Sequence, residues 1–368
     1  MTDPAPLQQI DRTFVRVGKR RLSYFSGCDY FRLASHPNVQ AAMQIGLRKF
    51  GLNVAASRLT TGNHVVYAQL EKELASFFKT EAALLVSTGY LTNLIVAQAL
   101  AGSFSHVLLD EKAHPSLGDA AHLFDCPVLR FKSCDVQDAL SAAKRCGPGS
   151  RLILLTDGMF ARDGSAAPLR EYVKLLPRDA RFLVDDAHGA GVLGKSGRGT
   201  PEHSEVDRRR VIQTVTLSKA FGTYGGTILC DRALRQKILD GSHMFIGSTP
   251  LPLPLANAAF CAVRILKTNS NLRQRLYRNS DYVKNALRKR GFPLPDAPGP
   301  IICLPELSAR ANRDLTNALL NANIYPPFIK YPGGPVNGYF RFVISSEHSR
   351  KQLDNLLEVL RSAQFGVS

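Results

Sequence analysis

Short apolar runs alternate with segments of helical periodicity through the first two thirds of the chain. A short apolar run bounded by turn residues is typical of a buried strand, and apolar residues spaced three and four apart indicate an amphipathic helix. The predicted strands cover residues 82–86, 106–110, 128–131, 152–156, 182–185, 211–217 and 227–230, and the predicted helices cover 37–50, 64–78, 91–100 and 168–176. This alternation predicts an α/β fold with three layers, in which helices cover both faces of a mostly parallel sheet.

The two ends of the chain show different patterns. Residues 1–36 are predicted to form an N-terminal arm, and residues 37–250 a large domain built on the sheet. Residues 251–368 are predicted to form a linking helix and a small C-terminal α/β domain. This last part contains a long helical pattern at 252–290, apolar runs at 301–303 and 340–344, and a final helix at 350–362.

Residues that can carry chemistry stand where three predicted strands end. Thr88-Gly89-Tyr90 follows the strand at 82–86, Asp185 ends the strand at 182–185, and Lys219 follows the strand at 211–217. Open parallel sheets bind their ligands beyond the carboxyl ends of the strands. These residues therefore fall where a sheet of this kind has its ligand site.

Lys219 stands where an apolar, β-branched strand opens into a glycine-rich loop, within the stretch VIQTVTLSKAFGTYGG. An amine that is partly removed from water loses its proton more easily, which suits an amine that forms a Schiff base. The alternative is a surface lysine that only closes the strand.

Asp185 is a carboxylate at the end of a hydrophobic strand, where burial without a cationic partner is costly. The partner could be a basic side chain in a structural salt bridge. It could also be the ring nitrogen of pyridoxal phosphate, which Asp185 would keep protonated. His188 follows three residues later and is either a loop hydrogen-bonding residue or a partner of the phenolic oxygen of the same ring.

Three other residues have both a structural and a functional interpretation. Gly89 precedes a predicted helix, whose N-terminus can bind an anion such as a phosphate. His114 follows a strand and could stack on a planar cofactor, or it could be an ordinary loop histidine. Arg341 lies inside an apolar run and should meet a carboxylate, from a substrate or, as the pattern alone favours, from the protein itself.

Composition and charge narrow the class of protein. The chain has 368 residues, of which 45% are hydrophobic, and a net charge of +17. A basic surface attracts phosphates, so nucleic acid, coenzyme A and an acidic acyl carrier protein are candidate partners, but no nucleic-acid-binding motif is present. Seven cysteines without regular spacing fit reduced thiols in a cytoplasm, and none pairs with a histidine at zinc-ligand spacing, so no metal site is expected. No apolar run is long enough to span a bilayer.

Together, these segments resemble the α-oxoamine synthases, a family of fold-type I pyridoxal-phosphate enzymes. The resemblance extends from about Ser26 to the last helix. It is closest at 184–200 and 214–226, which are most similar to 8-amino-7-oxononanoate synthases. It implies the fold of the pyridoxal-phosphate-dependent transferases, with the cofactor bound by the large domain.

The resemblance implies catalytic roles for four residues. Lys219 would form the Schiff base with the cofactor and then move protons at the α-carbon of the substrate. Asp185 would pair with the ring nitrogen and His188 with the ring hydroxyl oxygen, while His114 would stack on the ring face.

The resemblance also implies residues that bind the phosphate and the substrate. The backbone at Gly89 and Tyr90 would hold the phosphate together with Thr216. Ser248 and Thr249 would reach the phosphate from the other subunit of a homodimer. Arg341 would bind the carboxylate of the amino acid, and Asp29 occupies a position that contacts the substrate in relatives.

The implied reaction is a decarboxylative condensation of an amino acid with an acyl thioester, which gives an aminoketone. The donor would be an acyl-coenzyme A or an acyl carrier protein. Alternatives are an aminotransferase or an aldol-type lyase with the same cofactor, or a binding protein without activity on the same fold. Nucleic-acid binding is not expected.

Several substrate positions depart from the family pattern, while the cofactor positions are kept. Residues 51–58 replace a glycine-rich segment, Tyr67 replaces a histidine, Asp29 an asparagine and Ala161 a serine, and 330–334 differ from an arginine and T-V-P loop. These departures predict an altered acyl donor or amino acid.

Overall fold

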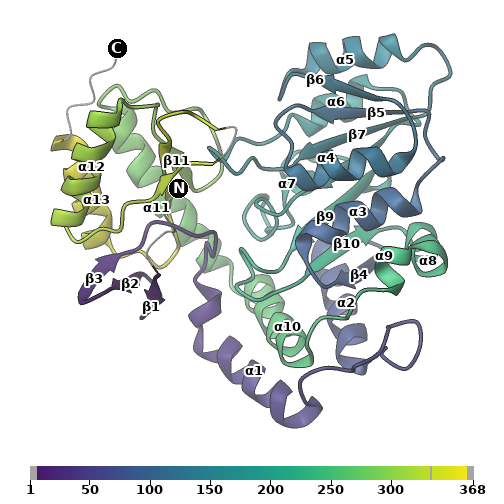
Figure 1. The fold of residues 1–368 in the computed structure, drawn as a ribbon, viewed down its shortest axis with the longest axis horizontal. Coiled ribbons are helices and arrows are strands. Elements are labelled where there is room, and N and C mark those ends of the chain that lie inside the picture. The colour runs from purple at the N-terminus through teal and green to yellow at the C-terminus, as the bar shows by residue number, and fades with distance from the viewer. Residues whose placement is uncertain (1–5, 332–333, 363–368) are drawn as a thin grey trace. The chain divides into compact units, whose positions relative to one another are not determined.

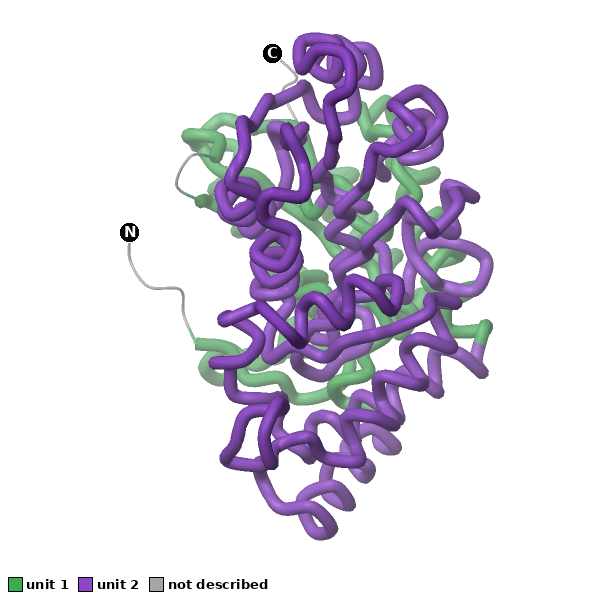
Figure 2. Tube along the Cα trace, turned by 90° about the vertical axis from the view of Figure 1, so that its right-hand side faces the viewer, with its two compact units in different colours: residues 1–36, 161–165, 270–368 green, residues 37–160, 166–269 purple. Residues whose placement is uncertain are grey.

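The computed structural model describes residues 6–331 and 334–362, which form two compact units (Figure 2). Unit 1 contains residues 1–36, 161–165 and 270–368, and unit 2 contains residues 37–160 and 166–269. The predicted domain boundaries at residues 36 and 250 stay a prediction. Residues 332–333 of the altered segment at 330–334 lie outside the described residues.

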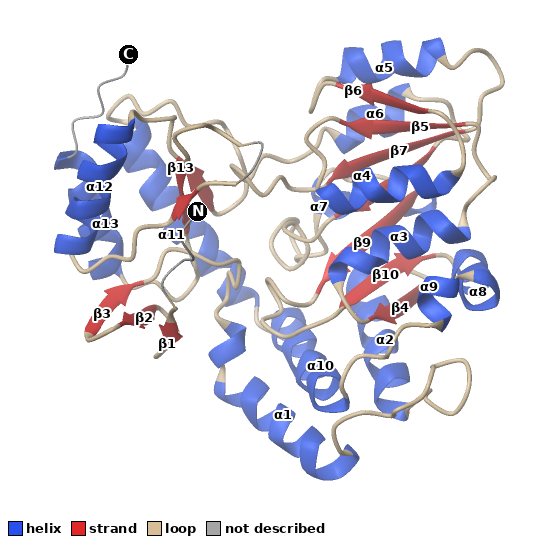
Figure 3. Cartoon of the chain, viewed as in Figure 1, coloured by secondary structure: helices blue, strands red, loops and turns tan. Residues whose placement is uncertain are grey.

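A seven-stranded sheet forms the centre of unit 2 (Figures 1 and 3). Its strands are, in spatial order, β4 (Ala82–Val86), β10 (Gly226–Cys230), β9 (Val211–Thr216), β8 (Arg181–Asp185), β7 (Leu152–Asp157), β5 (His106–Asp110) and β6 (Val128–Phe131). β10 runs antiparallel to both of its neighbours, and every other neighbouring pair is parallel. The predicted mostly parallel sheet is therefore confirmed.

Helices cover both faces of this sheet. Successive residues of a strand point to opposite faces, so neighbouring strand residues pack against different helices. Leu109 of β5 belongs to one buried cluster, and the adjacent Leu108 belongs to another. The first cluster includes residues of α3 (Gly89–Ala99), α4 (Pro115–Ala121), α8 (Arg232–Gly241) and α9 (His243–Ile246). The second includes residues of α5 (Val136–Arg145) and α6 (Leu169–Leu175). The three predicted layers are thus present.

Unit 2 also contains α1 (Pro37–Phe50), α2 (Val65–Phe78), α7 (Thr200–His203) and α10 (Leu253–Thr268). α1 packs closely on α10 at Gly46, where an added Cβ would lie 2.9 Å from the Cβ of Asn257. The continuous helical pattern predicted over 252–290 is wrong at one point. Asn269 separates α10 from α11 (Ser270–Arg288), with φ −116° and ψ 84°. Asparagine and serine side chains compete with the backbone for hydrogen bonds, which favours a helix boundary at this position.

Unit 1 is smaller and contains two three-stranded sheets. One consists of β1 (Gln8–Gln9), β2 (Phe14–Val17) and β3 (Arg20–Ser23), and the other of β11 (Ile301–Cys303), β13 (Tyr339–Val343) and β12 (Phe328–Ile329). A buried cluster joins β11 and β13 to α11, α12 (Ala309–Asn321) and α13 (Arg350–Ser362). The small α/β lobe expected near the C-terminus lies within this unit.

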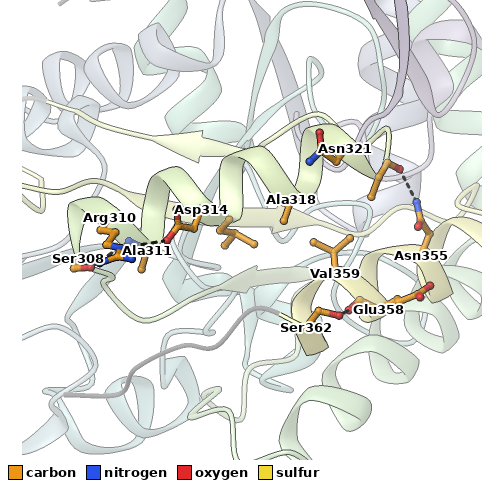
Figure 4. A pocket seen from close by; sticks show the side chains of 12 residues that line it. Ser308, Arg310, Ala311, Asp314, Ala318, Asn321, Asn355, Glu358, Val359 and Ser362 are labelled. Carbon is orange, nitrogen blue, oxygen red and sulfur yellow. Dashed lines mark hydrogen bonds and ion pairs between the residues drawn. The ribbon is translucent and has the colours of Figure 1, made fainter.

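A groove of about 890 Å³ lies between α12 and α13 of unit 1 (Figure 4). Its lining is apolar at Leu315, Ala318 and Val359 and charged at Arg310, Asp314 and Glu358. It contains none of the residues predicted to carry chemistry. In the described ranges, no helix is both long and apolar enough to cross a membrane.

Candidate active site

A hollow of about 200 Å³ lies at the edge of the sheet in unit 2 where the parallel strands end. Its walls come from residues that end or follow β4, β5, β7, β8 and β9, namely Gly89, Tyr90, His114, Ser116, Asp157, Asp185, Ala187, His188, Thr216, Ser218 and Lys219. All the residues that the sequence predicted to contact the cofactor from within one chain therefore line the same hollow.

Lys219 is half-buried in a tight loop after β9. The loop is closed by a hydrogen bond of 2.8 Å from the Leu217 amide to the Gly225 carbonyl, and the Gly222 amide donates to the Lys219 carbonyl at 2.9 Å. Gly222 and Gly225 have positive φ values, which favour glycine. The Lys219 Nζ lies 2.7 Å from the Nε2 of His188. The amine is thus held inside the hollow rather than in bulk water, against the interpretation of a surface lysine.

Asp185 is 8% exposed, and neutral groups donate to it. Asn93 donates to Oδ2 at 2.7 Å, the backbone amide of Ala187 donates to Oδ1 at 3.1 Å, and the Ser116 hydroxyl lies 3.5 Å from Oδ2. These contacts orient the carboxylate without neutralising its charge. A cationic ring nitrogen entering the hollow would therefore find an acceptor already in place.

His114 caps the N-terminus of α4. Its Nδ1 accepts a hydrogen bond from the Ser116 amide at 3.3 Å and lies 2.7 Å from the Ser116 hydroxyl. Burial lowers the pKa of His114 below its ordinary value. The ring is therefore held neutral with Nδ1 as the acceptor, and a neutral ring suits stacking on a planar cofactor.

Asp157 is a second buried carboxyl group in the hollow. It is the partner of Asp185 in the parallel pairing of β7 with β8, and its Oδ1 accepts the His114 amide at 2.9 Å. Burial, together with the negative charge of Asp185, raises the pKa of Asp157 well above its ordinary value. Asp157 therefore takes up a proton far more readily than an exposed aspartate does, while it fixes the loop that carries His114.

The N-terminus of α3 meets β9 at one side of the hollow. A Cβ added at Gly89 would lie 2.8 Å from the Cβ of Thr216, so only glycine permits this approach. The hydroxyl of Thr216 lies 2.7 Å from that of Ser218. The first amides of a helix have no acceptor within the helix, and here they stand beside two hydroxyl groups. This donor set fits a phosphate.

The chain matches the family of class I and II aminotransferases over residues 27–360. It belongs to this family. The 8-amino-7-oxononanoate synthase of Thioalkalivibrio sulfidiphilus is 36% identical over 353 residues, which cover 95% of this chain and 90% of that protein. The resemblance to the α-oxoamine synthases is thereby confirmed.

Solved structures of this aminotransferase family share the fold. The serine palmitoyltransferase of Sphingomonas wittichii has a TM-score of 0.92 and 27% identity, covering 98% of this chain and 92% of that one. A serine palmitoyltransferase from S. paucimobilis, with a bound PLP-myriocin aldimine, has a TM-score of 0.91 and 26% identity and covers 98% of this chain and 93% of that one. The predicted pyridoxal-phosphate transferase fold is confirmed.

Ser248 and Thr249 do not line the hollow of their own chain. They follow α9, where the Ser248 hydroxyl donates to the Met244 carbonyl, and Thr249 is exposed. The predicted role of these two residues in the site of a second subunit therefore stays a prediction.

Arg341 and Asp29 belong to unit 1, and their predicted role in substrate binding stays a prediction. The Nη1 of Arg341 donates to the Ala161 carbonyl at 2.9 Å, so a backbone oxygen is found where the apolar pattern favoured a carboxylate. The Nε of Arg341 is buried and has no hydrogen-bond partner among the described residues. The Oδ1 of Asp29 accepts the amide of Leu33, the first residue of the short helix η1 (Leu33–Ser35), at 2.9 Å, and burial raises the pKa of Asp29.

The altered loop at 51–58 ends in a buried ion pair. Arg58 pairs with Glu71 of α2, and Glu71 also accepts the Leu85 amide at 2.9 Å. Tyr67, where relatives have a histidine, is buried, and its hydroxyl donates to the Leu251 carbonyl. The Arg58–Glu71 pair holds the end of the loop against α2.

Sequence reasoning did not identify Asn93, Ser116, Asp157 and Ser218 as site residues. The sequence does contain a signal for Asp157. It directly follows the strand predicted at 152–156, much as Asp185 ends the strand predicted at 182–185. Asn93 is a polar residue among apolar helix positions. Its partners come from β8, β9 and α4, and no local pattern predicts such contacts.

Asp186 organises the glycine-rich loop that follows Asp185. It is fully buried and accepts hydrogen bonds from the Thr200 amide at 2.9 Å and from Nε2 of Gln213 at 2.6 Å. A Cβ at Gly189 or Gly199 would lie 2.1 Å or 1.8 Å from its carboxyl oxygens. Gly189 and Gly199 are therefore required by contact with Asp186.

Burial raises the pKa of Asp186 from 3.8 to about 7. Between these two pH values the folded protein retains a proton that the unfolded chain has lost, so this residue makes stability fall as pH rises. We expect the free energy of unfolding of the wild type, relative to Asp186→Asn, to fall between about pH 4 and pH 7 and to level off above. Each unit of pKa difference corresponds to about 1.4 kcal/mol.

Urea unfolding of both proteins from pH 4 to pH 8 measures this difference. Asp125→Asn, at an exposed position with φ 56° that asparagine tolerates, is the matched control and should leave the pH profile unchanged. Parallel profiles for the wild type and Asp186→Asn would show that Asp186 does not titrate in this range.

Proposed function

We propose that this protein is a pyridoxal-phosphate-dependent acyltransferase that condenses an amino acid with an acyl thioester, releases carbon dioxide and the thiol, and forms an aminoketone. The activity is of the 8-amino-7-oxononanoate synthase type. One observation carries the proposal. The Lys219 amine lies 2.7 Å from His188 in a hollow that also presents Asp185, in a chain 36% identical to such a synthase over 95% of its length.

The residues present fit pyridoxal phosphate at three separate points. Gly89 lies close to Thr216, so the N-terminus of α3 stands beside hydroxyl groups, and this arrangement suits the phosphate. Lys219 provides the amine for the aldehyde. Asp185, oriented by neutral donors, suits a protonated ring nitrogen. When bound, the cofactor supplies an electron sink for a carbanion at the substrate α-carbon.

The roles proposed for the chain's own residues follow from these positions. Lys219 holds the cofactor covalently and then moves a proton at the α-carbon, for which His188 at 2.7 Å is a hydrogen-bond partner. The neutral ring of His114 covers one face of the cofactor. Asp157 keeps His114 in place through the backbone amide.

We propose that Arg341 binds the carboxylate of the amino acid. The support is its buried Nε, which has no partner among the described residues and can therefore donate to an added anion. The net charge of +17 supports an anionic acyl donor, either acyl-coenzyme A or an acidic acyl carrier protein. A cytoplasmic location is proposed because none of the seven cysteines forms a disulfide in the part of the chain that the structure describes.

We also propose a homodimer in which Ser248 and Thr249 complete the partner's phosphate site. Support comes from α1, whose buried residues are Val39 and Gly46. Its Ile45 is 57% exposed, and Leu52 in the loop that follows is 68% exposed. Large apolar side chains gathered in one exposed segment are typical of an interface.

The experiment that tests the function supplies the purified holoenzyme with single amino acids and an acyl thioester. We expect equal amounts of carbon dioxide and free thiol to be released with the correct pair. The same acyl group on coenzyme A and on a carrier protein identifies the donor. Transfer of the amino group to a keto acid, without release of thiol, would instead indicate an aminotransferase.

A further inference from the structure

A buried hydrogen-bond network contacts the Asp185 carboxylate and reaches the wall of the hollow at Ser116. Asn93 of α3 is fully buried, and its Nδ2 donates both to Oδ2 of Asp185 at 2.7 Å and to the Ser116 hydroxyl at 2.9 Å. Ser116 is also fully buried and lies 2.7 Å from Nδ1 of His114. One amide group therefore contacts the carboxylate directly and the histidine through a single hydroxyl.

Thr214 of β9 holds the other end of this amide. The Thr214 hydroxyl donates to Oδ1 of Asn93 at 2.7 Å, and the residue is 1% exposed. Because the Asp185 carboxylate can only accept, Nδ2 of Asn93 faces Asp185 and Ser116, and Oδ1 accepts from Thr214, which helps to hold the amide in this orientation. Thr214 therefore donates a hydrogen bond to Asn93, and Asn93 in turn donates one to the Asp185 carboxylate.

An amide at this position has an electrostatic advantage over a basic side chain. It donates a strong hydrogen bond to the carboxylate and leaves the full negative charge unpaired. An arginine or lysine there would compensate the charge and weaken the attraction of Asp185 for a cationic ring nitrogen. Asn93 thus fixes the carboxylate and keeps it available.

Helix α3 joins this network to the anion site. Gly89 and Asn93 are four residues apart on α3, so they lie on the same face, separated by about 6 Å along the axis. The first turn of the helix faces the proposed phosphate position, and the second turn holds Asp185. One rigid element thereby sets the distance between the two ends of the binding site.

We infer that Asn93, oriented by Thr214, is a positioning residue that aims the Asp185 carboxylate at the ring nitrogen and keeps that nitrogen protonated. The inference rests on the proposed function, because it requires pyridoxal phosphate in the hollow. Asn93 acts through Asp185 and touches neither the cofactor nor the substrate.

The test compares Thr214→Val, Thr214→Ser and Asn93→Leu with the wild type. Valine matches the shape of threonine and removes only the hydroxyl, whereas serine retains it. Thr227→Val is the matched control, because Thr227 is equally buried on β10 and, among the described residues, its hydroxyl hydrogen-bonds only to the Leu84 carbonyl, at 3.3 Å. The measurements are the dissociation constant of pyridoxal phosphate and the ¹⁵N chemical shift of its labelled ring nitrogen, with the melting temperature as a check on folding.

We expect Thr214→Val to weaken cofactor binding by about threefold and Asn93→Leu by about tenfold or more, as for a lost hydrogen bond to a charged group. Both variants should move the ¹⁵N shift toward the unprotonated value, and Thr214→Ser should restore it. Thr227→Val should change neither quantity.

The measurements distinguish an error in the inference about Asn93 from an error in the proposed function. If the wild type binds the cofactor with a protonated nitrogen, and Thr214→Val matches Thr227→Val in affinity and shift, the inference about Asn93 is wrong and the proposed function stands. If the wild type takes up no pyridoxal phosphate, both are wrong.

Discussion

Lys219→Ala is expected to abolish the covalent attachment of pyridoxal phosphate and to lower the condensation rate by about 10³-fold or more. The Lys219 Nζ lies inside the hollow, 2.7 Å from Nε2 of His188. Its loss removes both the covalent link and the base at the α-carbon, and general-base catalysis alone contributes about 10²–10⁴-fold. Alanine leaves the loop's backbone hydrogen bonds from Leu217 and Gly222 intact.

The covalent link is measured by borohydride reduction of the holoenzyme, followed by mass spectrometry of the peptide that contains residue 219. Lys112→Ala is the matched control, since Lys112 follows β5 at the same edge of the sheet but is exposed and outside the hollow. The control should keep the visible absorbance, the label at position 219 and the rate. A label that persists in Lys219→Ala would place the attachment at another lysine.

Asp185→Asn is expected to retain the fold and to lower the rate by about 10²–10³-fold, the size of effect seen when one electrostatic contact to developing charge is removed. Asparagine has the same shape, and the hydrogen bonds around residue 185 come from neutral groups that it can partly satisfy. What it lacks is the negative charge that holds a proton on the ring nitrogen. The carbanion then loses its electron sink although the cofactor is still attached.

Steady-state rates, together with the ¹⁵N shift of the ring nitrogen, measure this effect, and the melting temperature verifies folding. The exposed Asp125→Asn variant removes the same charge elsewhere in unit 2 and should keep the wild-type rate. An Asp185→Asn enzyme with an undiminished rate would mean that the carboxylate has a structural role only.

The main elements of unit 2 could be predicted because strands buried on both faces form nearly continuous apolar runs. The strands at 106–110 and 128–131 agree with β5 and β6 at both ends. The direction of β10 could not be predicted, since its apolar run fits a parallel or an antiparallel neighbour equally well. The break at Asn269 was missed because apolar spacing continues from α10 into α11 on both sides of it.

The same contrast holds for the site. Lys219, Asp185 and Gly89 were found because each stands next to the end of a strand, where a parallel sheet exposes its carboxyl ends. Arg341 was given a carboxylate partner by the apolar pattern, and the structure provides the Ala161 carbonyl, 180 residues away, instead. A pattern can indicate that a buried guanidinium needs an acceptor, but it cannot identify the acceptor.

The sequence by itself determined the layered α/β fold, the family and the residues that end the strands, because these depend on periodicity and on local order along the chain. Only the tertiary structure decided that Asn93, Ser116 and Thr214 surround Asp185, since they come from two helices and a strand that are distant in the sequence. The physical reason is that hydrogen-bond partners of a buried carboxylate are selected by distances of about 3 Å in space, which sequence separation does not encode.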